Sequence, residues 1–378
     1  MSNVLDYIKW RGDLLFAQDP FNAIDSVIFS NLVYIRYPRE LFENGEMTIR
    51  QIQEALQQRG DATRLATAHR LELLQAAAAS NRFGGVKLAQ YRDDFIPEED
   101  TQFAALTGLL DDGTLVVAFR GTDNTLVGWK EDFNMSFQEA VPSQRLAVEY
   151  VRAVYERYAM PIYTCGHSKG GNLAMYAAAM SIPEIRQQIR DVYNNDGPGF
   201  QEHILTTPGY LEMVPRIHTY VPQSSIIGML MEHAEPYRVI KSTQVGIMQH
   251  DVFTWEVEGK SFIPVEELTP DAKFVNATIR GWLMSMDLQE RNQMVDALFK
   301  LLTYGNVERA ADIFQPKNIR QYMKLISTDD DIRRILTGEF ASLIDAAKNA
   351  AATASENQGD GQEESAEVGY FETCSRQL

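Results

Sequence analysis

Y-T-C-G-H-S-K-G-G-N-L-A-M-Y-A-A, residues 163–178, places Gly-His-Ser-Lys-Gly between a short apolar run and a run of small residues. Residues 166–170 fit the pattern G-x-S-x-G, which alone is a modest signal in a chain of this length. Its context is more specific, because residues 161–165 predict a strand and residues 170–180 predict a helix. A serine on such a turn is exposed at the sheet edge, beside helix N–H groups that can hold an oxyanion. We therefore predict that Ser168 is a nucleophile; the alternative is a glycine-rich turn that binds phosphate or nothing.

Outward from this stretch, apolar runs such as D-V-Y-N-N, R-I-H-T-Y-V and Y-R-V-I-K-S alternate with helical segments. This alternation is typical of βαβ units, so residues 81–268 predict an α/β core with a mostly parallel central sheet flanked by helices. Residues 1–80 predict a mostly helical segment packed on the core, and residues 269–348 a helical extension. Residues 349–378 are acidic and almost without large apolar side chains, which predicts a disordered tail.

Composition limits the function. Of the 378 residues, 35 are Lys or Arg and 52 are Asp or Glu, which gives a net charge of −17. That charge argues against a nucleic-acid binder and against a polybasic membrane anchor. No apolar run approaches the roughly 18 residues of a transmembrane helix, and no signal peptide is evident. Cys165 and Cys374 allow no zinc spacing or disulfide framework. We expect a cytoplasmic protein with no metal or cofactor, acting on a small substrate; the oligomeric state stays open.

A serine needs a base to take its proton, and in this kind of fold the chain order is serine, acid, histidine. His250 lies in a loop after the last predicted core strand, where the base belongs. His233 is the alternative. Of the other histidines, His167 lies on the elbow itself with its side chain directed elsewhere, and His218 lies within a predicted strand.

The acid is less clearly marked. Asp196, in Y-N-N-D-G-P-G-F, lies at the carboxyl end of the strand that follows the elbow helix, on the edge expected for the site. It could also be a turn aspartate that bonds its own backbone. Glu232, Glu235 and Asp251 are further candidates, and a site without an acid is the remaining alternative. We predict Asp196.

Acyl transfer also needs donors for an oxyanion. L-V-V-A-F-R-G-T-D ends a predicted strand at Thr122, so the N–H groups of Thr122 and Lys169 are the expected donors. The Thr122 hydroxyl is a candidate third donor. An ordinary polar turn is the alternative.

F-R-G-T, then G-W-K-E-D, then G-H-S-K-G-G resemble the class 3 lipase family of α/β-hydrolases over about residues 82–258. The whole chain up to the tail is still more similar to an uncharacterised bacterial branch of lipase-like proteins, once grouped as a domain of unknown function. The resemblance implies an α/β-hydrolase fold with helical additions at both ends. It places the family's nucleophile on Ser168, its oxyanion residue on Thr122 and its base on His250.

Two positions depart from the family pattern. The family's acid should follow the strand that ends at Val221, but the chain reads Q-S-S-I-I-G there, with Ser225 near the expected aspartate. Lys169 replaces a less charged residue, and we expect a solvated surface lysine rather than one that attracts anionic substrates. Residues 124–142 are either a lid or a helix whose aromatic residues at spacings of four face the core; we favour the helix.

The sequence therefore predicts a serine hydrolase of the esterase or lipase type, which cleaves an ester or thioester through an acyl-enzyme. The substrate is expected to be a small acyl ester or a lipid-like molecule. The alternative is a lipase-like scaffold that has lost turnover and binds a lipid or protein, because the acid is missing from its usual strand end.

Overall fold

The computed structural model of this chain describes residues 2–43, 45–60, 62–123, 125–304 and 315–359. Its centre is an 8-stranded sheet in which the strands follow one another in chain order. The strands are β1 (Met47–Thr48), β2 (Lys87–Ile96), β3 (Thr101–Leu109), β4 (Leu115–Phe119), β5 (Ile162–His167), β6 (Ile189–Asn195), β7 (Ile217–Pro222) and β8 (Tyr237–Ile240).

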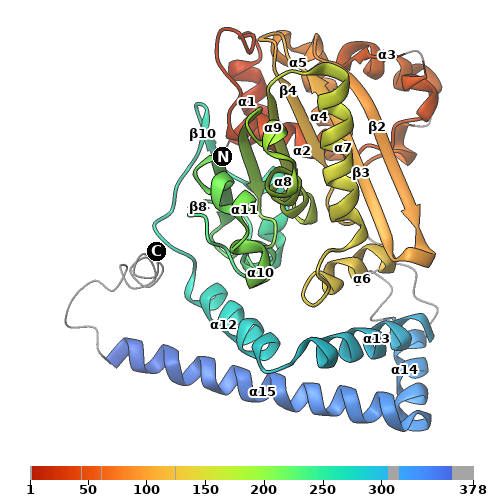
Figure 1. The fold of residues 1–378 in the computed structure, drawn as a ribbon, viewed down its shortest axis with the longest axis vertical. Coiled ribbons are helices and arrows are strands. Elements are labelled where there is room, and N and C mark those ends of the chain that lie inside the picture. The colour runs from red at the N-terminus through yellow and green to blue at the C-terminus, as the bar shows by residue number, and fades with distance from the viewer. Residues whose placement is uncertain (1, 44, 61, 124, 305–314, 360–378) are drawn as a thin grey trace.

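Neighbouring strands from β1 to β4 are antiparallel, and those from β4 to β8 are parallel. α-Helices join the parallel strands from β4 to β7, whereas β7 and β8 are joined by a segment that contains a short 3-10 helix, Ile227–Met229. The predicted α/β-hydrolase fold class, with a mostly parallel sheet flanked by helices, is confirmed (Figure 1). A small hairpin of β9 (Val257–Glu258) and β10 (Ser261–Phe262) follows the main sheet.

Helices cover both faces of the sheet, because side chains along each strand point alternately to either side. Val116 and Ala118 of β4 pack with the N-terminal helices, whereas Val117 and Phe119 pack with the helices between the parallel strands. The first group of helices is α1 (Val4–Arg11), α2 (Ala23–Leu32), α3 (Ile49–Arg59), α4 (Ala68–Ala79) and α5 (Asn81–Gly84). The second is α7 (Pro142–Tyr158), α8 (Lys169–Met180), α9 (Pro183–Arg186), α10 (Glu202–Leu205) and α11 (Pro208–Met213). Every residue of α2 is buried, so the N-terminal segment forms one full layer of the fold.

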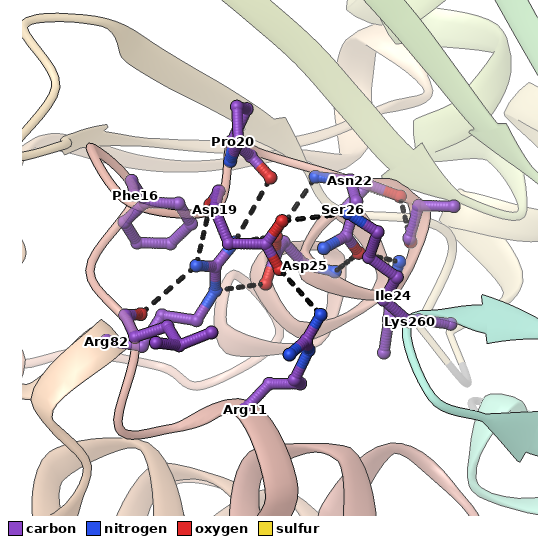
Figure 2. A network of polar contacts seen from close by, with 12 residues as sticks. Arg11, Phe16, Asp19, Pro20, Asn22, Ile24, Asp25, Ser26, Arg82 and Lys260 are labelled. Carbon is purple, nitrogen blue, oxygen red and sulfur yellow. Dashed lines mark hydrogen bonds and ion pairs between the residues drawn. The ribbon is translucent and has the colours of Figure 1, made fainter.

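A buried ion pair holds that layer together (Figure 2). Arg82 donates from Nε to Asp25 Oδ1 at 2.9 Å and from Nη2 to Oδ2 at 2.5 Å, and both side chains are fully buried. Asp25 Oδ1 also accepts the Tyr7 hydroxyl at 2.9 Å, and Arg82 Nη1 donates to the carbonyl of Asp19 at 2.9 Å. A bidentate pair with its remaining groups satisfied ties three N-terminal segments together.

The start of the chain closes onto a much later segment. The N–H of Val257 in β9 donates to the carbonyl of Ser2 at 2.9 Å, and Asn3 Nδ2 donates to the carbonyl of Phe253 at 3.1 Å. Helix α1 is thereby fastened to the stretch that directly follows His250.

The C-terminal helices form a layer beyond the carboxyl ends of the parallel strands, on the side where α6 (Leu126–Asn134) and α10 lie (Figure 1). They are α12 (Pro270–Met284), α13 (Leu288–Tyr304), α14 (Pro316–Thr328) and α15 (Asp330–Gly359). Helix α15 passes the predicted boundary at residue 349, because A-A-K-N-A-A-A-T-A is rich in helix-favouring alanine. The rest of the predicted tail, residues 360–378, lies outside the described residues. Within the described ranges, none of the helices has the length and apolar character to cross a membrane.

Candidate active site

Ser168 lies at the turn between β5 and α8, as the strand and helix patterns predict. Its backbone has φ 59° and ψ −136°, in a region that residues other than glycine rarely adopt. Its N–H donates to the carbonyl of Asn195 at 3.0 Å, which fixes the turn against the end of β6. A strained residue held by its surroundings between strand and helix has the geometry of a nucleophile elbow.

The glycines around Ser168 are required by close packing. A Cβ on Gly170 would lie 2.2 Å from the carbonyl oxygen of Phe119, and a Cβ on Gly166 would lie 2.0 Å from the Gly170 backbone. On the neighbouring turn, a Cβ on Gly121 would lie 2.9 Å from the Ser168 Cβ. The ends of β4 and β5 can therefore approach each other only with glycine at these positions.

His250 and Asp196 come together at the carboxyl end of the sheet. His250 Nδ1 lies 2.6 Å from Asp196 Oδ2; the aspartate side chain is 1% exposed and the histidine side chain 25%. Asp196 has φ 55°, so its backbone also lies in the left-handed region. The turn after it is bonded by Asn194, whose Oδ1 accepts the N–H of Gly197 at 2.9 Å, and not by Asp196 itself. An imidazole bonded through Nδ1 to a buried carboxylate is oriented as a general base.

Ser225 is the second hydrogen-bond partner of the Asp196 carboxylate. It follows β7, where the family pattern places the aspartate, and its hydroxyl donates to Asp196 Oδ1 at 2.5 Å. Both oxygens of the Asp196 carboxylate are therefore bonded, one to His250 and one to Ser225. The end of β6 supplies the carboxylate, and the end of β7 supplies a hydroxyl that orients it.

The other candidate acids have different partners. Glu232 forms an ion pair with Arg280 at 2.8 Å, and Asp251 accepts the N–H of Phe253 at 3.1 Å. Glu235 is buried and bonds to His233 Nδ1 at 2.8 Å, to Thr219 and to Tyr210.

The pairing with Glu235 concerns His233, the alternative candidate for the base. The pKa of His233 is raised, although its burial opposes this, because the negative charge of Glu235 and the bond to it favour the charged ring. His233 thus pairs with Glu235, and the structure does not join it to Asp196.

Thr122 lies next to Gly121 on the turn after β4, beside the elbow. Its hydroxyl donates to Asp132 Oδ2 at 2.5 Å, so the hydroxyl hydrogen is directed away from an oxyanion. This corrects the expectation that the Thr122 hydroxyl is a third donor; its backbone N–H remains the candidate. Burial raises the pKa of Asp132 to about 6, although the nearby ammonium of Lys169 lowers it.

The side chain of Lys169 is not solvated, which corrects the prediction from sequence. It is fully buried, and its Nζ lies 2.7 Å from Glu131 Oε2 and 2.9 Å from the carbonyl oxygen of Gln102. Glu131 also accepts the N–H groups of Gln102 and Ser143, at 3.1 and 2.9 Å. The cation is neutralised inside the protein, because G-W-K-E-D places a glutamate on α6 next to the first turn of α8. The N–H of Lys169, at the start of α8, remains a candidate oxyanion donor.

Helix α6 lies within residues 124–142. Residue 124 lies outside the described residues. Phe133 and Phe137 pack against the C-terminal helices, and the Phe133 and Phe299 rings lie 5.9 Å apart. Trp129 is 37% exposed and Phe137 lies beyond the end of α6, so the predicted helical apolar stripe holds only for Phe133. The C-terminal layer also contacts the residue that bonds Asp196, since Asn276 of α12 donates to the carbonyl of Ser225 at 3.2 Å.

Sequence reasoning missed two residues near the base. The ring of His167 does not point away from the site; it lies 4.4 Å from the ring of His250, measured between centroids. Tyr34, from the N-terminal layer, has its hydroxyl 3.3 Å from His167 Nδ1. The position of His167 beside the nucleophile is a signal that could have been followed, whereas nothing in the sequence around Tyr34 indicates a functional site.

Comparison with known proteins identifies a family whose model matches this chain. The model of the Mbeg1-like family matches residues 77–300. Among solved structures, the Rhizomucor miehei lipase in its propeptide complex is 16% identical, with 57% of this chain and 67% of that chain covered and a TM-score of 0.35. M37 lipase is 14% identical, with coverage of 65% and 82% and a TM-score of 0.35. No curated protein matches the sequence. Because the family model spans more than half of the chain, this lipase-like α/β protein belongs to the Mbeg1-like family.

Proposed function

We propose that the protein is a serine hydrolase that cleaves a carboxylic ester or thioester through an acyl-enzyme. The observation that carries the proposal is the 2.6 Å contact between His250 Nδ1 and the buried Asp196 carboxylate. Because Asp196 occupies Nδ1, the base uses Nε2 to accept the hydroxyl proton of Ser168.

In the first half of the reaction, Ser168 Oγ attacks the acyl carbonyl while its proton passes to His250. The negative charge that develops on the carbonyl oxygen is held by the N–H of Lys169, at the start of α8, and by the N–H of Thr122. Asp196 orients the ring and stabilises the imidazolium. His250 then gives the proton to the leaving alcohol or thiol, and the acyl group stays on Ser168.

In the second half, a water molecule gives a proton to His250 and attacks the acyl carbonyl. Collapse of this second tetrahedral intermediate breaks the bond to Ser168 Oγ, which takes the proton back from His250. The acid is released and the serine is restored.

A fluorophosphonate probe tests the proposal, because it reacts covalently with an activated serine. We expect the full chain to be labelled and Ser168→Ala to lose the label. Ser181→Ala is the matched control: Ser181 is a buried serine at the other end of α8, and its hydroxyl donates to the carbonyl of Ala177 at 2.7 Å. A folded chain that takes up no label would refute the hydrolase and favour a lipase-like binding protein. A series of p-nitrophenyl esters and acyl thioesters of increasing chain length would then define the substrate.

A further inference from the structure

His167 is a buried histidine beside the nucleophile, and the proposed reaction gives it no role. It ends β5, is 6% exposed, and has its ring in contact with that of His250, at a tilt of 36°. Its Nε2 lies 2.8 Å from the backbone carbonyl oxygen of His250. The residue therefore holds the main chain of the candidate base and not its ring nitrogens.

The hydrogen-bond partners define the tautomer of His167. A carbonyl oxygen can only accept, so Nε2 must carry the hydrogen, and Nδ1 of the neutral ring is then an acceptor. The Tyr34 hydroxyl, 3.3 Å from Nδ1, is placed to donate to it. Burial lowers the pKa of His167 well below its ordinary value, and the neighbouring His250 lowers it further, which agrees with a neutral ring.

Tyr34 reaches this position from the N-terminal layer. The Arg70 guanidinium lies 3.9 Å from the centre of the Tyr34 ring and packs over it. A Cβ on Gly121 would lie 2.2 Å from the Tyr34 hydroxyl oxygen and 2.5 Å from the carbonyl oxygen of His167. The hydroxyl therefore fills the space between the turn that carries Thr122 and the elbow. Residue 34 also lies outside residues 77–300, which the family model matches.

We propose that Tyr34 and His167 are positioning residues for the base His250. The hydroxyl of Tyr34 fixes the tautomer of His167. The Nε2–H of His167 then bonds the carbonyl of His250 and keeps the His250 ring directed toward Ser168. A neutral ring is also the compatible neighbour for a base that becomes an imidazolium during each cycle, because two cationic rings in contact would repel. This inference rests on the proposed function. It implies that the reaction also requires the N-terminal layer, because that layer supplies Tyr34.

The test compares His167→Phe with His167→Gln in the full chain. Phenylalanine keeps the ring and loses both nitrogens, whereas glutamine can offer an N–H near the position of Nε2. We expect His167→Phe to lower kcat about 10-fold or more with KM within about twofold, as the loss of supporting hydrogen bonds does elsewhere. His167→Gln should recover most of that loss. Tyr34→Phe should lower kcat about 5-fold, the effect of one hydrogen bond.

His218→Phe is the matched control. His218 also stacks on an aromatic ring, that of Tyr193, and bonds to a carboxylate, that of Asp191, but it lies away from Ser168 in β7. We expect its kcat to equal that of the wild type.

Labelling by fluorophosphonate separates the outcomes. If the wild type is labelled and His167→Phe is labelled and turns over at the same rate, the positioning role is overturned while the hydrolase stands. The same holds if His167→Gln is no better than His167→Phe. If His167→Phe does not fold, Tyr34→Phe decides: an unchanged kcat overturns the proposal, and a lower kcat at an unchanged melting temperature supports it. A wild type that is not labelled overturns the hydrolase and this role together.

Discussion

Asp25 in the N-terminal layer and Asp196 at the carboxyl end of the sheet are both buried carboxylates. Each bonds a nitrogen-bearing side chain and a hydroxyl: Asp25 bonds Arg82 and Tyr7, besides the Asn22 N–H, and Asp196 bonds His250 and Ser225. The partners differ in chemistry. Arginine is a permanent cation, whereas a neutral imidazole has a nitrogen that can accept a proton.

The two aspartates also differ in backbone and access. Asp25 is in the first turn of α2, in a capping box, and its partner Arg82 is fully buried. Asp196 has φ 55°, and its partner His250 is 25% exposed. Similar partners thus stabilise the fold around Asp25 and, in the proposed reaction, orient the base beside Asp196. A positive φ and a partly exposed imidazole partner distinguish Asp196 from Asp25.

The largest effect should come from Asp196→Asn. The amide cannot stabilise an imidazolium and favours the wrong tautomer of His250, so we expect kcat/KM to fall about 10³- to 10⁴-fold. The free energy of unfolding should change little by comparison. Ester hydrolysis and urea denaturation measure the two quantities, and equal activity of the variant and wild type would remove Asp196 from the mechanism.

Arg82→Met should have the opposite profile. It leaves Asp25 buried without its cation, which costs about 3–5 kcal/mol of stability. The rate of fluorophosphonate labelling per folded molecule should be unchanged. Adding Asp25→Leu should restore part of the stability, because a buried pair replaced by apolar residues is often tolerated. Slower labelling of the folded fraction would mean that this region also serves the reaction.

The hydroxyls of Ser225 and Tyr7 allow a second comparison of the two aspartates, with smaller expected effects. Ser225→Ala removes a donor to Asp196 and should lower kcat about 5- to 10-fold, since one hydrogen bond contributes about 1 kcal/mol. Tyr7→Phe removes the matching donor to Asp25 and should cost about 1 kcal/mol of stability with no change in kcat. Thermal melts and steady-state kinetics on both variants test this, and a Ser225→Ala variant that loses only stability would contradict it.

Asp132 provides a test of a different kind, because its effect should appear as a change of stability with pH. Its side chain is 32% exposed, and its pKa is about 6 in the folded protein against 3.8 ordinarily. The folded state therefore binds this proton more tightly, and the contribution of Asp132 to the free energy of unfolding falls as pH rises from about 4 to about 6.

Asp132→Asn should remove that slope, so the variant should gain stability relative to the wild type between these pH values and keep a constant difference above about pH 6. Urea denaturation at several pH values measures the difference. Parallel stability curves for the two proteins would show that Asp132 does not titrate in this range.

The core of the fold and the elbow were predictable because they depend on local sequence. The strand before Ser168, the helix after it and the glycines that allow their contact are all within a few residues. Lys169 was misjudged because its partner Glu131 comes from α6, and no sequence spacing indicates that α6 lies beside α8. Tyr34 was missed for the same reason: its hydrogen bond to His167 joins residues 133 positions apart. Local patterns predict elements, whereas such contacts depend on how the elements pack.

The fastening of Ser2 and Asn3 to the segment 253–257 has a consequence for synthesis. Asn3 and Phe253 are 250 positions apart. A ribosome adds about 5–20 residues per second, so the first helix waits roughly 12 to 50 s for its partner. Over the last third of that time, the nascent chain contains the serine elbow but not yet His250 or the segment 253–257. A growing chain therefore cannot carry out the proposed reaction until most of the protein has been made.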